Sequence, residues 1–195
     1  WRNGEKEMRV IAGTARRINL KTPDGLDTRP TQDRIKETLF NILQFDLEDQ
    51  DVLDLFSGSG ALGIEALSRG AKRAVFCDSA RQAILCIEEN LEKTHFKEQA
   101  LVLPGDYNGA INALMRKDYH FGLVFMDPPY GRELAEKALI RLKDKAFVSQ
   151  DTLFVVEAGL QEDFSGMEEE GYSILREKIY KTNKHVFLRL KGEIG

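Results

Sequence analysis

DVLDLFSGSGALGIEALSRG, residues 51–70, joins a short apolar run, a glycine-rich turn and an amphipathic stretch. The apolar run predicts a buried strand and the amphipathic stretch predicts a helix. Between them Gly58, Gly60 and Gly63 form a GxGxxG pattern. Glycines at such a turn let a ligand approach the N-terminus of the helix. The stretch therefore predicts an α/β fold with a ligand at the end of its first core strand.

The same succession of patterns continues along the chain. Apolar runs at 73–77, 100–103 and 121–126 are each followed by a helical pattern, and a further run lies at 152–158. Continuous apolar strands that alternate with helices predict a parallel sheet covered by helices on both faces. The segments 172–179 and 184–190 face each other across YKTN and predict a hairpin, so we expect the sheet to close with an antiparallel strand.

The composition is that of an ordinary globular protein. Of the 195 residues, 42% are hydrophobic and 31% are charged, which suits one domain with a full core and a small appendage. No apolar run approaches the roughly 20 residues of a membrane helix, and the first residues show no signal-peptide pattern. We therefore expect a cytoplasmic protein with no membrane partner. We also expect Met8 to be the natural start and residues 1–7 to be a tag or tail.

The cysteines and histidines do not have the spacing of a metal site. Cys77 ends an apolar run and Cys86 lies in a helical pattern, which favours reduced core thiols. His95, His120 and His185 are scattered, which favours surface or loop positions. No bound metal is expected.

A basic segment precedes the glycine-rich turn. From Arg9 to Lys36 there are seven basic residues and three acidic ones, a net charge of +4 in a chain whose net charge is −4. The patterns RVIAG and RINLKT flank a turn at Gly13 and Thr14 and predict a β-hairpin, followed by the loop PDGLDTRP and a helix capped by Thr31. We therefore divide the chain into a tail (1–7), a basic hairpin and loop (8–30) and a main domain (31–195).

Three acidic residues end successive predicted strands. Asp54 would repel a pyrophosphate but attract the positively charged amino group of a methionine moiety. Asp78 is placed to accept the hydroxyls of a ribose, and Asp106 to reach an adenine amine. For each of them the alternative is a helix N-cap. With the glycine loop they predict S-adenosylmethionine as cofactor and S-adenosylhomocysteine as product. The further expected contacts come from Phe56, Ser57, Gly58, Gly60, Ser79 and Tyr107.

The segment DPPY follows the fourth core strand and predicts the reacting centre. Asp127 precedes a proline and is held extended, and Pro128 presents a carbonyl in a rigid geometry. Two such acceptors on the hydrogens of an exocyclic amine would turn its lone pair out of conjugation with a nucleobase and aim it at a sulfonium methyl. Pro129 completes the rigid turn, and Tyr130 would stack on the base, a contact worth about 1 to 3 kcal/mol. The alternative is a turn that only ends the strand.

Four segments, MRVIAG, TRPTQDRIKETLFNIL, VLDLFSGSGALGIEALSRGA and DPPY, occur in this order and resemble the bacterial 16S rRNA guanine-N2 methyltransferase (RsmD-like) family. The resemblance runs from Met8 to about Leu142. It implies a class I methyltransferase fold with strand order 3-2-1-4-5-7-6, strand 7 antiparallel, and methyl transfer to N2 of guanine 966. It also implies 16S rRNA in the small ribosomal subunit, or in an assembly intermediate, as partner. The residues expected to meet RNA are Arg9, Arg16, Arg17, Arg29, Thr31 and Arg34.

Three alternatives stay open. DPPY serves any exocyclic amine, so an adenine-N6 methyltransferase acting on DNA or another rRNA is the first, although enzymes that read a DNA sequence usually carry a recognition domain. A nicotinamide oxidoreductase shares the GxGxxG pattern but has no use for Asp54 or DPPY. A ribosome-assembly factor without catalysis would bind RNA on the basic segment but leave the acid-lined loop unexplained.

Overall fold

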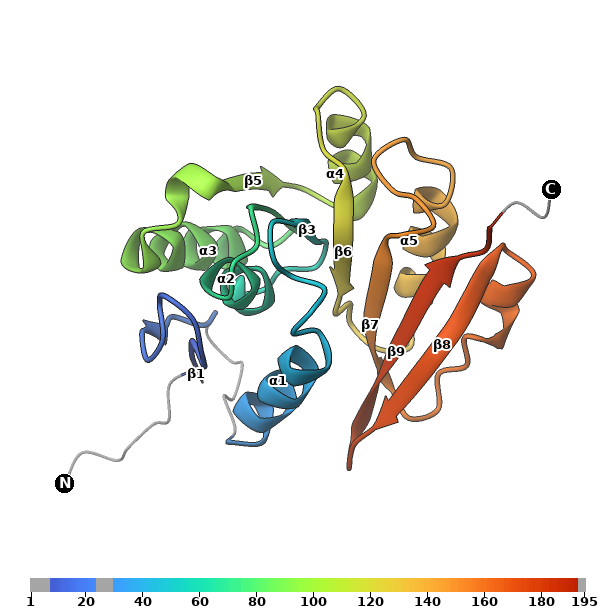
Figure 1. Cartoon of the computed structure of the whole chain (residues 1–195), viewed down its shortest axis with the longest axis horizontal. Coiled ribbons are helices and arrows are strands. Elements are labelled where there is room, and N and C mark those ends of the chain that lie inside the picture. The colour runs from blue at the N-terminus through green and yellow to red at the C-terminus, as the bar shows by residue number, and fades with distance from the viewer. Residues whose placement is uncertain (1–7, 24–29, 193–195) are drawn as a thin grey trace.

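Figure 1 shows a computed structural model of the chain, which describes residues 8–23 and 30–192. Its strands are β1 (Met8–Arg9), β2 (Asn19–Leu20), β3 (Asp51–Asp54), β4 (Arg73–Asp78), β5 (Ala100–Pro104), β6 (Phe121–Met126), β7 (Leu153–Gly159), β8 (Tyr172–Ile179) and β9 (Asn183–Leu190). Its α-helices are α1 (Pro30–Ile42), α2 (Ala61–Ser68), α3 (Arg81–Thr94), α4 (Tyr107–Leu114) and α5 (Leu134–Leu142). Two 3-10 helices, η1 (Lys97–Gln99) and η2 (Ser165–Glu168), precede β5 and β8.

The main sheet has seven strands in the order β5-β4-β3-β6-β7-β9-β8. Its first five strands are parallel, and β9 runs antiparallel to both β7 and β8. When the seven strands of this sheet are numbered from one in chain order, the order is 3-2-1-4-5-7-6, as the resemblance to the RsmD-like family implied. The parallel sheet and the closing antiparallel hairpin are both confirmed.

Helices cover both faces of this sheet because the central strands are apolar on both sides. In β6, Leu123 and Phe125 pack into a cluster with α1, α2 and α3, whereas Val124 and Met126 pack into a second cluster with α4 and α5. Figure 1 shows the two groups of helices on opposite sides of the sheet. The carboxyl ends of the parallel strands therefore meet at one edge, between α1 and the β8–β9 hairpin.

The predicted basic hairpin is confirmed, but its ladder is short. Met8 pairs with Leu20 and Arg9 with Asn19, and Val10 N donates to the Ile18 carbonyl at 3.0 Å. The reason lies outside the hairpin: the backbone N–H groups of Ile11 and Ala12 donate to the carboxylate of Glu65 in α2, at 2.9 and 3.1 Å. Donors that a longer ladder would use are thus satisfied by the main domain.

A second set of contacts holds the turn of the hairpin on the same helix. Thr14 N donates to the Ser68 carbonyl at 2.8 Å, and Ala15 N donates to Ser68 Oγ at 3.0 Å. Gly13 has φ +82°, and a Cβ there would lie 1.7 Å from the Ser68 carbonyl oxygen, so only glycine allows this approach. The basic segment is therefore docked on α2 rather than free.

Three smaller expectations have clear outcomes. Helix α1 begins at Pro30, so Thr31 lies inside the helix and does not cap it. Proline is well suited to the first helical turn because it has no backbone N–H, and an N–H at that position would have no acceptor within the helix. Cys77 and Cys86 are buried and reduced, as predicted. Among the described residues, no helix combines the length and the apolar character needed to cross a membrane.

Candidate active site

A cavity of about 1230 Å³ opens at the carboxyl edge of the sheet. Its walls come from the hairpin, α1, the glycine loop, the ends of β4, β5 and β6, and the ends of β7 and β9. Eleven predicted site residues line it: Phe56, Ser57, Gly58, Asp78, Ser79, Asp106, Tyr107, Asp127, Pro128, Pro129 and Tyr130. The glycine loop and DPPY, which are far apart in sequence, therefore share one cavity.

The glycine loop is held in shape by short hydrogen bonds. Ser57 N donates to the Cys77 carbonyl at 2.8 Å, and Ser57 Oγ donates to the Asp54 carbonyl at 2.6 Å. Gly58 and Gly60 have φ values of +56° and +79°, in the left-handed region that favours glycine. The loop is thus shaped by hydrogen bonds within the protein, and Gly60, at the start of α2, does not line the cavity.

Asp54 lies beneath this loop without lining the cavity. It is 1% exposed; its Oδ2 accepts from Gly63 N at 3.2 Å, and its Oδ1 has no hydrogen-bond partner among the described residues. Burial raises the pKa of this carboxyl to about 7, with the Gly63 N–H opposing the shift and the charge of Asp78 adding to it. A buried acceptor without a partner fits a ligand that brings a cation.

Asp78 and Asp106 both line the cavity, yet each also has a structural role. Asp78 accepts from Gly58 N at 2.9 Å and from Ala80 N at 2.8 Å, which fixes its carboxylate beside the loop. Asp106 is the N-cap of α4 and accepts from Gly109 N at 2.8 Å. The N-cap alternative is therefore confirmed for Asp106, and its contact with an adenine amine stays a prediction.

The DPPY segment continues from β6 into the cavity. Pro128 is buried, whereas Tyr130 is 49% exposed and its hydroxyl donates to Glu157 Oε1 at 3.1 Å. Asp127 meets solvent in the cavity but is surrounded by protein, and this burial, with the charges of Glu157 and Asp54, raises the pKa of its carboxyl well above the usual value. Asp127, Pro128 and Tyr130 thus line one cavity, and the roles predicted for them stay predictions.

Polar residues that the sequence analysis did not select complete the wall beyond Tyr130. They are Arg132, Glu157, Lys181, Asn183 and His185. Asn183 Nδ2 donates to Glu157 Oε1 at 2.7 Å, and His185 Nε2 lies 3.5 Å from Glu157 Oε2. His185 is 2% exposed, so the expectation of a surface or loop histidine is wrong. The pairing of β7 with β9, in which Glu157 lies opposite His185, creates this group.

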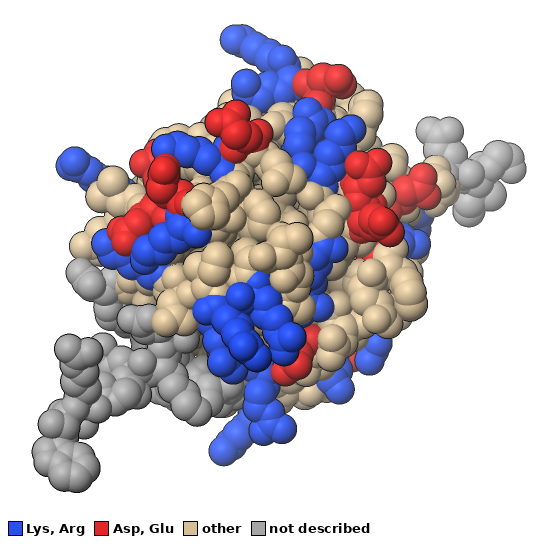
Figure 2. Space-filling model, turned by 60° about the vertical axis from the view of Figure 1, so that its left-hand side comes forward, with Lys and Arg blue, Asp and Glu red and all other residues tan. Residues whose placement is uncertain are grey.

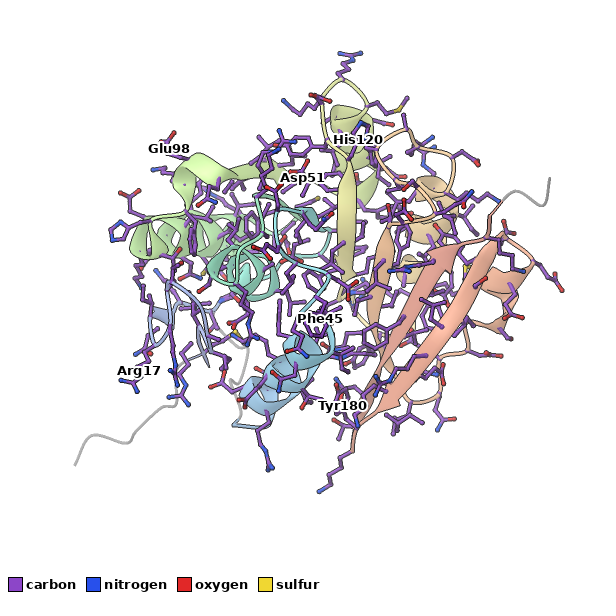
Figure 3. All side chains as sticks on the ribbon, in the orientation of Figure 1. Arg17, Phe45, Asp51, Glu98, His120 and Tyr180 are labelled. Carbon is purple, nitrogen blue, oxygen red and sulfur yellow. The ribbon has the colours of Figure 1, made fainter. Side chains whose placement is uncertain are left out.

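The predicted RNA-contacting residues lie near the cavity but outside it. Four of these predicted residues are arginines that the structure describes: Arg9, Arg16, Arg17 and Arg34. All four are exposed, and none lines the cavity. Arg29 lies outside the described residues, as does the side chain of Thr31. Figure 2 shows Lys and Arg side chains gathered at the lower edge of the face it presents. Figure 3 shows Arg17 pointing away from the body of the protein.

Lys36 joins this basic segment to the cavity. Its Nζ donates to the Arg9 carbonyl at 2.6 Å and lies 3.5 Å from Glu65 Oε2, while the residue is 5% exposed and lines the cavity. Burial lowers the pKa of this amine, and the charges of Glu65 and Asp33 counteract the shift. The hairpin and the cavity wall are therefore linked through one buried ion pair.

In the described part of the chain, no three His, Cys, Asp or Glu residues are grouped as metal ligands would be. The sheet order, the glycine loop and the acids at the strand ends instead define the class: this is the class I fold of S-adenosylmethionine-dependent methyltransferases. The chain belongs to the family described as "Conserved hypothetical protein 95", whose model matches residues 8–189.

Named relatives of this chain share most of its length. It is 37% identical over 182 residues to the putative rRNA methyltransferase YlbH of Bacillus subtilis, covering 89% of this chain and 98% of that protein. It is 34% identical over 177 residues to the ribosomal RNA small subunit methyltransferase D of Escherichia coli K12, covering 91% and 87%. The solved structure of the putative methyltransferase yhhF from Escherichia coli superposes with a TM-score of 0.79 at 33% identity, covering 96% and 99%.

Proposed function

We propose that this protein transfers a methyl group from S-adenosylmethionine to the N2 amine of a guanine in small-subunit rRNA, with guanine 966 of 16S rRNA as the expected position. The observation that carries the proposal is the shared cavity of the glycine loop and DPPY, because it brings a cofactor cradle and an amine-binding turn together. Relatives named as rRNA methyltransferases support rRNA as the substrate class.

The cofactor would be held by groups that the loop already orders. Asp54 Oδ1, which has no hydrogen-bond partner among the described residues, would accept from the amino group, and Asp78 would accept from the ribose hydroxyls. Asp106 and the Phe56–Tyr107 ring pair, with centroids 5.9 Å apart, would bound the adenine. When bound, the sulfonium of S-adenosylmethionine supplies an electrophilic methyl group.

On the other side of the cavity, the residues of DPPY would prepare the amine. The Asp127 carboxylate and the Pro128 carbonyl would each accept one hydrogen of the exocyclic amine, while the exposed ring of Tyr130 would stack on the base. Most of the rate enhancement would come from this positioning, with Asp127 taking a proton late in the reaction. The base would have to be unpaired or turned out of its helix to reach them.

The basic segment would place the RNA across the mouth of the cavity. Arg16 and Arg17 are exposed on the hairpin and Arg34 is exposed on α1, where phosphate contacts would fix the position of the target loop. The expected partner is 16S rRNA within the small subunit or an assembly intermediate. Such a substrate would place the protein in the cytoplasm.

Labelled S-adenosylmethionine offered with three substrates tests the proposal. These are small subunits that lack the modification, naked 16S rRNA, and DNA. We expect label on a guanine of the rRNA, at N2, mapped by nuclease digestion and mass spectrometry. Label on adenine or only on DNA would contradict the proposal, and no transfer to any substrate would favour an assembly factor without catalysis.

A substitution at the reacting centre separates binding from chemistry. Asp127→Ala should retain S-adenosylmethionine binding, measured by calorimetry, and lose about 10²- to 10⁴-fold in methyl transfer. Undiminished transfer would refute the role given to Asp127.

A substitution in the basic hairpin tests RNA binding. Arg16→Ala should leave cofactor binding unchanged and weaken RNA binding, with a shallower salt dependence. An unchanged salt slope would remove Arg16 from the RNA interface.

A further inference from the structure

Glu157 lies beside the reacting centre on the neighbouring strand. In the pairing of β6 with β7, Met126 lies opposite Val156, so Asp127 and Glu157 follow next on the two strands at the carboxyl edge. Both residues line the cavity. Strands in a sheet are about 4.8 Å apart, a spacing that lets two side chains reach neighbouring atoms of one base.

The carboxylate of Glu157 is held in one orientation and keeps room for a further donor. Its Oε1 accepts from Tyr130 Oη at 3.1 Å and from Asn183 Nδ2 at 2.7 Å, whereas among the described residues Oε2 has only His185 Nε2, at 3.5 Å. Burial raises the pKa of Glu157, but the interactions with His185, Asn183 and Tyr130 outweigh it and lower the pKa overall. An ionised carboxylate only accepts hydrogen bonds.

Asn183 adds an independent sign that this wall presents acceptors. The residue is 6% exposed and lines the cavity; its Nδ2 is committed to Glu157, and its Oδ1 has no hydrogen-bond partner among the described residues. Because Glu157 is an acceptor, the amide nitrogen must face it, and the oxygen is left for another donor. The wall next to Asp127 thus carries two acceptor atoms, Glu157 Oε2 and Asn183 Oδ1, that the described residues do not saturate.

Guanine matches such a wall and adenine does not. Along its Watson–Crick edge guanine carries the N1–H donor directly beside the N2 amine, whereas adenine has an unprotonated N1 that would face the carboxylate with a lone pair. A site with buried acceptors strongly disfavours a base that cannot supply the donor.

We propose that Glu157 determines base specificity by accepting the N1–H of the target guanine while Asp127 and Pro128 hold its N2 amine. This inference rests on the proposed function and names the group that reads the base. Asn183 and His185 act through Glu157 by holding its carboxylate, and are therefore positioning residues.

The test compares two RNA oligonucleotides that differ only at the target base, guanine or 2-aminopurine. Both carry the 2-amino group, but N1 of 2-aminopurine has no hydrogen. We expect the wild-type kcat/KM for the guanine oligonucleotide to exceed that for the 2-aminopurine oligonucleotide about 10-fold to 100-fold, the range expected for a hydrogen bond to a charged group. In Glu157→Gln this preference should fall at least 10-fold, because an amide can turn its N–H toward an unprotonated N1.

Two further variants separate base reading from a structural role. Glu162→Gln is the matched control. Glu162 accepts from Gly159 N at 2.6 Å and from Gly131 N at 3.3 Å but does not line the cavity, so its rates with both oligonucleotides should change by the same factor and its base preference should equal that of the wild type. Asn183→Ala removes one donor that orients Glu157 and should narrow the preference by a smaller factor, which keeps the inference testable if Glu157→Gln does not fold.

The possible failures are distinguishable. If Glu157→Gln and Asn183→Ala slow both oligonucleotides by the same factor, Glu157 only supports Tyr130 and the inference is overturned while the proposed function stands. If the wild type methylates guanine and 2-aminopurine equally, the inference is likewise overturned. If the wild type methylates neither these oligonucleotides nor intact subunits, the proposed function fails and the inference with it.

Discussion

Strand β3 carries an aspartate at each end, and the hydrogen-bond partners of the two carboxylates differ. Asp51, at the amino edge, accepts from Arg73 Nε at 2.8 Å, and the guanidinium of Arg73 lies 4.2 Å from the centre of the Tyr119 ring. Asp54, three residues later at the carboxyl edge, is 1% exposed with an oxygen that has no partner in the described structure. Figure 3 shows Asp51 near His120, at the edge opposite Tyr180.

The two carboxylates differ in whether the fold supplies a charged partner. Asp51 has one: its hydrogen bond with Arg73 raises the pKa of Arg73 and joins β3 to β4. Asp54 Oδ2 accepts from the neutral N–H of Gly63, and burial raises the pKa of its carboxyl to about 7. The protein thus carries an unfavourable buried carboxyl at the carboxyl edge of the sheet, beneath the loop that lines the cavity.

Removing the charge of Asp54 should have the largest effect, on stability. The folded pKa is about 7 and the ordinary value is 3.8, so folded wild type holds a proton that the unfolded chain has lost between these values. Its free energy of unfolding therefore falls as the pH rises from about 4 to 7 and is level above. Asp54→Asn should be more stable at pH 8 by on the order of 3 kcal/mol, and nearly equal at pH 4.

Urea denaturation of the two proteins across this pH range measures the difference. Asp127 contributes a slope of the same sign, because its pKa is also raised. The charge of Asp54 is one cause of that shift, so Asp54→Asn reduces the slope from Asp127 as well, and the measured difference includes this reduction. A stability difference that does not change with pH would show that Asp54 is ionised at all these values and that the contrast with Asp51 is wrong.

The same substitution should weaken the cofactor site. A hydrogen bond to a charged group contributes about 1.5 to 3 kcal/mol, so Asp54→Asn should raise the dissociation constant of S-adenosylmethionine about 10- to 100-fold. Calorimetric titration at pH 8 gives this number. If Asp54→Asn is more stable than the wild type and binds S-adenosylmethionine more weakly, the ionised Asp54 carboxylate destabilises the fold but strengthens cofactor binding. An unchanged affinity would show that Asp54 does not contact the cofactor.

Asp51→Asn is the converse and should act on stability alone. Arg73 is 37% exposed, so water can replace part of the lost interaction, and we expect a loss of about 1 kcal/mol. The dissociation constant of S-adenosylmethionine should be unchanged, because Asp51 lies at the far edge of the sheet. A weaker cofactor affinity in this variant would show that the two ends of β3 are coupled.

The sequence predicted the first half of the cavity well because its signals are local. The apolar run, the glycines and the acid of 51–70 are adjacent in the chain, and DPPY carries its chemistry in four residues. Glu157 could not be selected in the same way: within VVEA it is one acid in an apolar strand, and only the pairing with β9 brings it to Asn183 and His185. Long-range pairing leaves no local pattern.

The short ladder of the hairpin has a similar physical origin. Alternation in RVIAG and RINLKT indicated cross-strand hydrogen bonds, but the donors of Ile11 and Ala12 go to Glu65, 54 and 53 positions away. The sequence predicts only that Glu65 belongs to a helix. Its role as acceptor for another segment follows only from the packing of that segment against the helix.

The smallest effect is a proton released on binding. If the ammonium of S-adenosylmethionine lies against Asp54, it lowers the pKa of that carboxyl below about 7, so binding at pH 7 should release roughly half a proton. Calorimetry in buffers of different ionisation enthalpy measures this release. Methylthioadenosine is the matched control, because it has the same nucleoside but no amino group, and it should bind without release. Equal release with both ligands would place the titrating group elsewhere, and would separate the raised pKa of Asp54 from recognition of the amine.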